Sequence, residues 1–592
     1  MAHDRRGPYL MSLMARQSAY ASARIAALLL AAATSLGTTV GCRGCDDTTR
    51  SAVRLASEGN SRELRPDAER PATERRPGIL LVALDGVPRQ TLYGLLRRGQ
   101  LPGFARLLGG AGDGGQLAHA HLDETLLSTL PSSTLASWAT TFTGVAPARH
   151  GISGNEFFIR ESRRFIAPVP VSVESNAQTL ETESDSLVDQ ILPVPTVYQR
   201  MRRAEPAMTI WVALSQVHGG ADRFLLPDRS VLVHAITARV GSAVGLEPAY
   251  APYARVDEAV LDNVREDLDR HGAPDVLTLY LFGTDLYAHE AEVGPLPALE
   301  TYLREVLDAR LGALADHLQR LGALDDRFVV VVSDHGHTAV VPDDAHSLGT
   351  DRDGEDEPPT VLRRAGFRLR PFELEVPAET PFDAVLAYQG AMAFVYLADR
   401  TRCPGGVCAW SEPPRYREDV LAAAEAFHRA NTGVGPVAAM RGTLDFILVR
   451  VPVALAEDDR PFEVYLGGGR TRSVEDYLRD YPHPDYVSFA SRLRDLAVGP
   501  RGERAGDVLL LAHNGDRQRP EDRYYFAHEY RSWHGSPSRG DSELPFIVAH
   551  RHRSPGALAS LVREALGPER APTQDRVADV LLALRRARRA DR

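Results

Sequence analysis

Short apolar runs alternate with amphipathic stretches along most of the chain after residue 78. The first run, "GILLVALDG", is followed by "MTIWVAL", "DVLTLYLF", "RFVVVVS", "GDVLLLA" and "LPFIVA". Between two of these runs, residues 298–324 place leucine and valine at the spacing of one helical face. Strands that alternate with helices predict an α/β fold, in which a mostly parallel central sheet is flanked by helices on both faces.

The alternation breaks between about residues 340 and 505. This part contains the acidic stretch "DRDGEDEPP" and short elements rich in Pro and Gly. We therefore expect a cap or subdomain at about 340–505, inserted into a catalytic domain of residues 78–551. A helical segment at 552–592 is expected to pack on the core. Residues 42–77 are rich in Arg, Glu, Ser and Pro, which predicts a flexible tether.

The N-terminus has the pattern of an export signal. A basic start leads into "IAALLLAAATSLGTTVGC", an apolar stretch that is short for a membrane span and is followed by small residues. This predicts a signal peptide at 1–41 and a periplasmic or cell-surface location. The segment before Cys42 resembles a lipoprotein cleavage site, although Thr39 stands where an aliphatic residue is usual. Simple secretion and an uncleaved anchor remain alternatives, and a lipid on Cys42 would be the one attachment to a membrane.

Composition excludes several kinds of chemistry. The 592 residues carry a formal net charge of −11, which gives no basic footprint for nucleic-acid binding. All 68 basic residues are arginine, so a P-loop lysine, a Schiff-base lysine and a Ser-Lys dyad are impossible.

The four cysteines give one pairing prediction. Cys403 and Cys408 flank the tight turn "CPGGVC", and in an oxidising compartment a local disulfide is favoured. A zinc site at this turn would need two further ligands nearby, and the sequence shows none.

Polar side chains stand where the predicted strands end. Each alone has an ordinary explanation: a helix cap, an exposed ion pair or a surface histidine. Because open α/β sheets place their chemistry at the carboxyl ends of strands, we expect them to meet. Carboxylates and imidazoles suit Zn²⁺ and related divalent ions, and six ligands fit two ions that clamp a phosphoryl group. The six are Asp85, Asp285, His289, Asp334, His335 and His534.

A cluster of hydroxyls precedes a helical pattern in "LPSSTLASWATTFTGVAPARHGISGNEFF". A hydroxyl at a helix N-terminus is usually a cap. The same position favours an anion, and a nearby metal would lower the pKa of the hydroxyl, so Ser132, Ser133 and Thr134 are candidate nucleophiles.

These motifs, in this order, resemble the alkaline phosphatase superfamily, and most closely its nucleotide pyrophosphatase/phosphodiesterase branch. The matching segments are Asp-Gly after the first strand, "PSSTLASWATTFTGVAPARHGISGN", "DLYAH", "SDHGH" and "HGS". The resemblance implies that Thr134 is the nucleophile and that two zinc ions are bound. It also implies that Asp285, His289 and His534 hold one ion, while Asp85, Asp334, His335 and the Thr134 oxygen hold the other.

The chain departs from that branch at several positions. Ser137 replaces an asparagine that contacts a phosphate oxygen, which makes Ser137 a weaker candidate for substrate binding. Ala136 replaces a proline, and Ser133 stands where lysine is frequent. His337 replaces a residue that is commonly apolar, and we interpret it as a bystander, with a supporting or substrate role as the alternative.

The expected activity is hydrolysis of phosphodiester or pyrophosphate bonds through a phosphothreonine intermediate. The expected substrate is a phosphorylated small molecule or a nucleotide-like compound. A phosphomonoesterase, a phosphotransferase and a non-catalytic surface lipoprotein that keeps the fold are the alternatives. A sulfatase is disfavoured, because "SSTLASW" lacks the Cys/Ser-x-Pro-x-Arg segment of formylglycine enzymes.

Overall fold

The computed structural model describes residues 61–65, 76–110, 117–173, 175–227, 242, 246–349, 357–435, 437–452, 460–515, 519–526 and 529–587. The predicted signal peptide, Cys42 and most of the predicted tether lie outside these residues. Among the helices that are described, none combines the length and the apolar character needed to cross a bilayer.

The main domain is built on an eight-stranded sheet with the order β1-β7-β6-β8-β2-β9-β18-β3. Its five central strands, from β7 to β9, are parallel, while β1 and β18 run antiparallel to their neighbours. Every residue of β8 and β9 is buried, as expected for strands covered on both faces. The strands are β1 Ser61–Glu63, β2 Gly78–Leu84, β3 Ala120–Asp123, β6 Ile210–Ala213, β7 Arg223–Leu225, β8 Val276–Leu281, β9 Arg327–Ser333 and β18 Phe546–Ala549.

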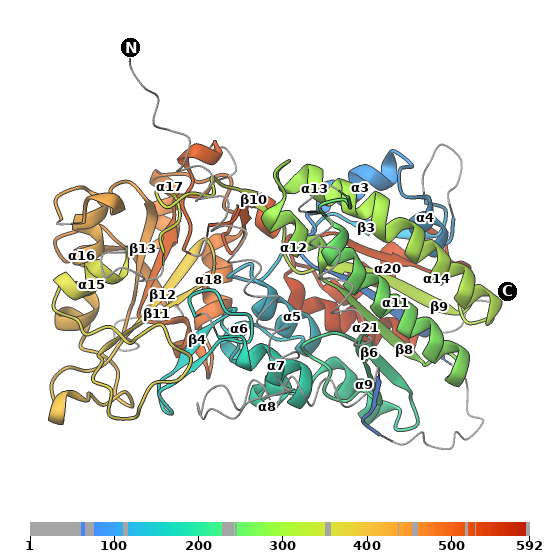
Figure 1. Ribbon diagram of the computed structural model, residues 1–592, viewed down its shortest axis with the longest axis horizontal. Helices are drawn as coiled ribbons and strands as arrows, with labels where there is room; N and C mark the ends of the chain where they lie inside the picture. Colours follow the sequence, from blue (N-terminus) through green and yellow to red (C-terminus); the bar gives the residue numbers. More distant parts are fainter. Residues whose placement is uncertain are drawn as a thin grey trace, which may run out of the picture.

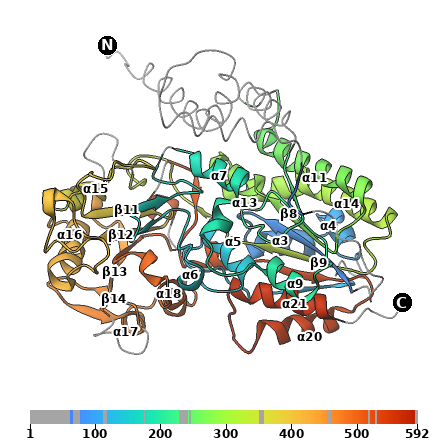
Figure 2. The same ribbon diagram turned by 90° about the horizontal axis from the view of Figure 1, so that it is seen from below.

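Helices cover both faces of this sheet (Figure 2), with α11 and α14 on one side and α20 and α21 on the other. On the first side α14 packs against α4 and α11, and on the second α21 packs against α5 and α9. The fold is therefore the predicted α/β architecture. The first group is α3 Arg89–Arg97, α4 Pro102–Leu107, α11 Ala251–His271, α12 Gly283–Glu290, α13 Pro295–Tyr302 and α14 Asp308–Arg320. The second is α5 Thr134–Thr143, α9 Val197–Ala204, α20 Pro555–Leu566 and α21 Val577–Arg586, and the shorter helices α6 Pro147–His150, α7 Ala177–Asp185 and α8 Leu187–Ile191 lie between α5 and α9 in the chain.

A second domain lies beside the main sheet, at the left of Figure 1. Its six-stranded sheet has the order β11-β12-β16-β13-β14-β15 and is antiparallel throughout. Successive residues of β12 belong to two separate hydrophobic clusters, one with α16 and one with α18, so this sheet is buried on both faces. The elements are β11 Ala384–Tyr388, β12 Met392–Leu397, β13 Leu444–Arg450, β14 Phe462–Tyr465, β15 Thr471–Ser473, β16 Val508–Ala512, α15 Pro359–Arg364, α16 Leu421–Asn431, α17 Val474–Asp480 and α18 Phe489–Ala497.

Two short antiparallel pairs complete the strands. The first joins β4 and β5, and the second joins β10 and β17. The second pair connects the end of the main sheet to the segment that precedes β18. Their bounds are β4 Phe157–Ile159, β5 Arg164–Ile166, β10 Thr338–Ala339 and β17 Ser532–Trp533.

The strand at 508–512 corrects one expectation from the sequence. The run "GDVLLLA" was assigned to the main alternation, but β16 pairs with β12 and β13 in the second sheet. The inserted domain therefore extends beyond residue 505. A continuous apolar run indicates a strand buried on both faces, and this condition holds in either sheet, so the run itself could not assign β16 to one of them.

The predicted tether also contains an element of the fold. Residues 61–63 form β1 at the edge of the main sheet, and the backbone N–H groups of Leu64 and Arg65 donate to the carbonyl of Asp222 at 2.7 and 3.2 Å. Edge pairing relies on backbone hydrogen bonds, so the low apolar content of the segment gave no sign of it.

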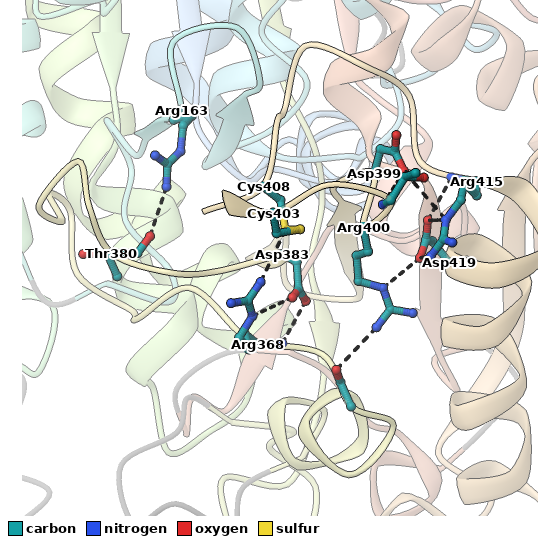
Figure 3. Close-up of a disulfide and its surroundings, with 12 residues drawn as sticks. Arg163, Arg368, Thr380, Asp383, Asp399, Arg400, Cys403, Cys408, Arg415 and Asp419 are labelled. Carbon is teal, nitrogen blue, oxygen red and sulfur yellow. Dashed lines mark hydrogen bonds and ion pairs between the residues drawn. A yellow bond between two sulfur atoms is a disulfide. The ribbon is translucent and has the colours of Figure 1, made fainter. Parts of the chain in front are cut away.

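The disulfide between Cys403 and Cys408 closes the loop that follows β12 (Figure 3). Nearby, Arg368 Nε lies 2.8 Å from Asp383 Oδ2, and Arg400 Nε lies 2.7 Å from Asp419 Oδ1. Arg368 Nη2 also donates to Cys408 Sγ at 3.3 Å, so the disulfide lies next to one of these ion pairs in the second domain.

Candidate metal centre

Three neighbouring parallel strands deliver polar side chains to the same edge of the main sheet. Asp85 follows β2, and Asp334 and His335 follow β9. The strand β8 is followed by α12, whose residues Asp285 and His289 stand one helical turn apart. Because β8, β2 and β9 are adjacent, their carboxyl ends bring these five side chains together.

The sixth side chain, His534, arrives from the loop after β17. Its backbone carbonyl accepts a 2.9 Å hydrogen bond from the N–H of Ala391, in the turn between β11 and β12 of the second domain. The rings of His534 and His335 stack with centroids 3.6 Å apart. The main domain and the second domain therefore meet where His534 enters the cluster.

The six side chains form two groups whose donor atoms lie within 4.8 Å of one another. In the first, Asp285 Oδ1 lies 3.4 Å from His289 Nε2 and 3.9 Å from His534 Nε2. In the second, His335 Nε2 lies 3.4 Å from Asp85 Oδ1 and 3.3 Å from Asp334 Oδ2. These separations are compatible with atoms that share one ion at bonds of about 2.0–2.2 Å.

Three carboxylates are buried here without enough hydrogen-bond donors. Among the described residues, Asp85 Oδ1, Asp285 Oδ1 and Asp334 Oδ2 have no hydrogen-bond partner. Burial, with the neighbouring Asp334 and Asp285 charges, raises the pKa of Asp85 well above its ordinary value. Burial likewise raises the pKa of Asp334 to about 8. The chain's own groups therefore leave the negative charge of Asp85 and Asp334 uncompensated. Burial also disfavours the charge of Asp285, but the neighbouring His289 holds the pKa of that carboxyl well below its ordinary value.

In each of the three candidate ligand histidines, Nδ1 makes a hydrogen bond to a backbone carbonyl and Nε2 points toward the carboxylates. The Nδ1 atoms of His289, His335 and His534 lie 2.6, 3.1 and 2.9 Å from the carbonyl oxygens of Ser532, Gly336 and Ser132. A carbonyl only accepts, so each Nδ1 carries the hydrogen, and in the neutral imidazole each Nε2 then turns a lone pair toward the carboxylates. Orphaned carboxylate oxygens facing imidazole lone pairs are the donor set of a divalent metal centre, which these buried clusters are consistent with.

Thr134 lies at the edge of the second group. It is the first residue of α5, and its Oγ1 is 3.1 Å from His335 Nε2. The N-cap residue, Ser133, makes no capping hydrogen bond through its side chain. Instead Asn155 Oδ1 accepts from the N–H of Leu135 at 2.9 Å, which fixes the first turn. The Thr134 hydroxyl is therefore placed at a positive helix end beside the candidate metal ligands.

Ser137, the candidate substrate-binding residue, points elsewhere. Its side chain is fully buried, and its Oγ lies 3.2 Å from Ser128 Oγ, behind the loop that carries Asp334. Ser137 stands one helical turn after Thr134 on α5, and its hydroxyl contacts Ser128. Substrate binding by Ser137 stays a prediction.

Several supporting residues could not be recognised in the sequence. Tyr280, inside β8, donates its hydroxyl to Asp85 Oδ2, and Thr284 Oγ1 donates to the carbonyl of Asp85 at 2.5 Å. The buried guanidinium of Arg492 donates to Ser132 Oγ at 2.9 Å, next to the carbonyl that binds His534. These residues act through contacts between distant segments, for which no local pattern exists.

Comparison with known proteins gives one family match. A family model described as type I phosphodiesterase/nucleotide pyrophosphatase matches residues 79–398. No curated protein matches the chain.

Among solved structures, murine ectonucleotide pyrophosphatase/phosphodiesterase 5, an inactive variant in complex with AMP, is 13% identical. That match covers 87% of this chain and 96% of the murine chain, with a TM-score of 0.47. Phosphonoacetate hydrolase from Sinorhizobium meliloti, in complex with phosphonoformate, is 17% identical over 86% of this chain and 98% of its own, with a TM-score of 0.42.

Proposed function

Because the chain belongs to the type I phosphodiesterase/nucleotide pyrophosphatase family, we propose that it hydrolyses phosphodiester or pyrophosphate bonds of nucleotide-like substrates through a phosphothreonine on Thr134. One observation carries this proposal. The Thr134 hydroxyl stands at the N-terminus of α5, 3.1 Å from His335 Nε2 and beside the paired carboxylate and imidazole groups.

Two divalent ions, with zinc as the expected metal, complete the site. Asp285, His289 and His534 would hold one ion, and Asp85, Asp334 and His335 the other, next to Thr134. When bound, such ions lower the pKa of a hydroxyl and offset the charge of a phosphoryl group.

The chain's own residues then act in two steps. Thr134 Oγ1 forms a bond to phosphorus while the bond to the leaving oxygen, on the opposite side, breaks. Water next cleaves the phosphothreonine and restores the hydroxyl. The helix end at α5 favours the anionic group during both steps, and the fixed Nδ1 hydrogen bonds keep the imidazoles from turning.

Replacement of the nucleophile tests the proposal. Thr134→Ala should lower kcat on a nitrophenyl phosphodiester by about 1,000-fold or more, because only the nucleophile is removed. The matched variant Thr134→Ser keeps a hydroxyl and should retain measurable turnover. Bound metal, measured by mass spectrometry, should stay within a factor of two in both. Full activity of Thr134→Ala would exclude Thr134 as the nucleophile.

A substrate panel tests the bond that is cleaved. We expect kcat/KM for nitrophenyl diesters and for a dinucleotide pyrophosphate to exceed the values for the monoester and the sulfate. A preference for the monoester would instead assign the chain to the phosphomonoesterase alternative.

We also propose that the protein is exported and carries a lipid on Cys42. The basic start, the apolar stretch and the glycine before Cys42 support this. The wild type should incorporate a labelled fatty acid, and Cys42→Ala should not. Equal incorporation of the label into the two proteins would contradict lipid anchoring at Cys42.

A further inference from the structure

His337 lies inside the candidate metal centre, outside both predicted ligand groups. It follows β9 by four residues, is 4% exposed, and its Nε2 is 3.0 Å from Asp285 Oδ1. Its donor atom also lies within 4.8 Å of donor atoms of both Asp285 and His335, which belong to different groups. His337 therefore reaches the space between the two candidate ions.

The hydrogen bonds of Ser532 identify which nitrogen of His337 carries hydrogen. Ser532 Oγ donates its single hydrogen to the carbonyl of Ala288 at 2.8 Å. Toward His337 Nδ1, 3.1 Å away, the hydroxyl can therefore only accept. Nδ1 carries the hydrogen, and Nε2 presents a lone pair, as in the other three histidines of the cluster.

The lone pair on His337 Nε2 faces a lone pair on Asp285 Oδ1. Among the described residues, neither His337 Nε2 nor Asp285 Oδ1 has a hydrogen-bond partner, and both atoms are buried. Two electron-rich atoms 3.0 Å apart in a buried space repel each other unless a cation lies against both. Their separation suits two ligands of one ion with bonds of about 2.0–2.2 Å.

The backbone leaves room for this approach. Gly86, directly after Asp85, has φ +67, and a Cβ built there would stand 2.5 Å from His337 Nε2 and 2.9 Å from Asp285 Oδ1. A side chain at position 86 would thus displace the imidazole from Asp285. Glycine at position 86 permits the positive φ and leaves space for the His337 imidazole.

We propose that His337 is a further metal ligand, which binds through Nε2 the ion that Asp285 holds. The proposal rests on the metal centre of the proposed function and adds one imidazole to it. A fourth protein ligand on that ion would hold it more tightly, and would take a position that water or substrate could otherwise occupy.

Metal binding by the full chain tests the proposal. After chelator stripping, Zn²⁺ affinity is measured by competition with a chromogenic chelator, and Co²⁺-loaded protein by its visible absorption. His337→Leu should weaken binding of one of two ions by about 100-fold, and should change the Co²⁺ spectrum because an imidazole leaves the ligand field. His552→Ala, which removes an exposed histidine, should match the wild type in both measurements.

A second variant keeps the test valid if His337→Leu does not fold. Ser532→Ala removes the acceptor of the Nδ1 hydrogen but keeps the backbone carbonyl that holds His289, so about tenfold weaker binding is expected. Two ions bound with unchanged affinity and an unchanged Co²⁺ spectrum in the folded variants would overturn this proposal alone. A wild-type chain that binds no Zn²⁺ would overturn the metal centre of the proposed function as well.

Discussion

Asp334 shows, at the scale of single residues, what kind of site this is. Its Oδ1 accepts from the N–H groups of Gly86 and His335 at 3.0 and 2.9 Å, while Oδ2 has no partner among the described residues. An unpaired buried charge is costly. In this cluster three half-satisfied carboxylates lie together beside imidazole nitrogens, and that combination is the sign of a bound cation.

Asp257 offers a pH-dependent contrast outside the cluster. On α11, its Oδ2 accepts from Tyr302 OH at 2.8 Å and from the N–H of Gly283, the first residue of α12, at 3.2 Å. Burial raises the pKa of Asp257 to about 7. A raised folded-state pKa gives stability that is present below the unfolded value, near 4, and is lost as pH rises through about 7.

Asp257→Asn should therefore change how stability depends on pH. Between pH 5 and pH 8, ionisation of Asp257 lowers the free energy of unfolding of the wild type by roughly 2–3 kcal/mol. The amide of the variant does not ionise, so the variant lacks this loss. Urea unfolding at pH 5, 6.5 and 8 should show the variant gaining stability relative to the wild type as pH rises. Asp262→Asn, on the same helix with a side chain 53% exposed, controls for loss of one charge. If the difference in free energy of unfolding between Asp257→Asn and the wild type were the same at all three pH values, the raised pKa of Asp257 would be contradicted.

The ligand candidates and their partners differed in how far the sequence could predict them. Asp85, Asp334 and Asp285 follow apolar runs, and the carboxyl ends of neighbouring parallel strands share one edge of a sheet. The sequence therefore predicts that these three residues lie together. The sequence predicts a bystander role for His337, because it replaces a residue that is commonly apolar in the family branch. Its contacts with Asp285 and with Ser532, nearly 200 residues away, are visible only in the structure. Residues that act through long-range contacts leave no periodic trace.

At the scale of elements, the loop after β17 connects the two domains. Gly535 has φ +105, and a Cβ there would stand 1.9 Å from the carbonyl oxygen of Gln389, in the β11–β12 turn. Gln389 in turn accepts from the N–H of Asn155 at 2.7 Å, close to the start of α5. The position of His534 thus depends on a close approach between two backbones.

Gly535→Ala should disturb this contact. The left-handed backbone costs an alanine about 1–3 kcal/mol, and the clash with a rigid carbonyl adds to that cost. We expect lower stability in urea unfolding and weaker Zn²⁺ binding, because the His534 loop must move. Gly567→Ala is the matched control, since Gly567 has φ +85 but meets nothing within 4 Å. Equal Zn²⁺ affinity in the two variants would show that the loop does not set the position of His534.

Element type was easier to predict from the sequence than element membership. The apolar runs of β2, β8, β9 and β18 indicated strands of the main sheet, and they are. The run of β16 indicated a strand equally well, yet it pairs with β12 and β13. Burial on both faces produces the same run in a parallel and in an antiparallel sheet, and only the pairing partners distinguish them.

At the scale of the whole molecule, the centre lies where the two domains meet. The main sheet supplies Asp85 and Asp334, and the loop that carries His534 pairs β17 with β10 and contacts the turn after β11. Ions bound there would connect segments from residue 85 to residue 534. A ligand that binds the folded chain but not the unfolded chain raises the free energy of unfolding by mass action.

Removal of metal should therefore destabilise the chain as a whole. At a free Zn²⁺ concentration 1,000-fold above Kd, each ion adds about 4 kcal/mol to the free energy of unfolding. Calorimetry of the full chain should show a lower Tm after chelation, because the buried carboxylates Asp85 and Asp334 then lack a counter-charge. Added Zn²⁺ should restore the Tm, whereas Mg²⁺, which prefers oxygen ligands, should restore less. The variant Asp285→Asn controls for effects of the chelator itself, since its Tm should respond less to chelation. An unchanged wild-type Tm, with no ion detected before chelation, would contradict the metal centre. The folded chain would then tolerate the buried carboxylates without a bound cation.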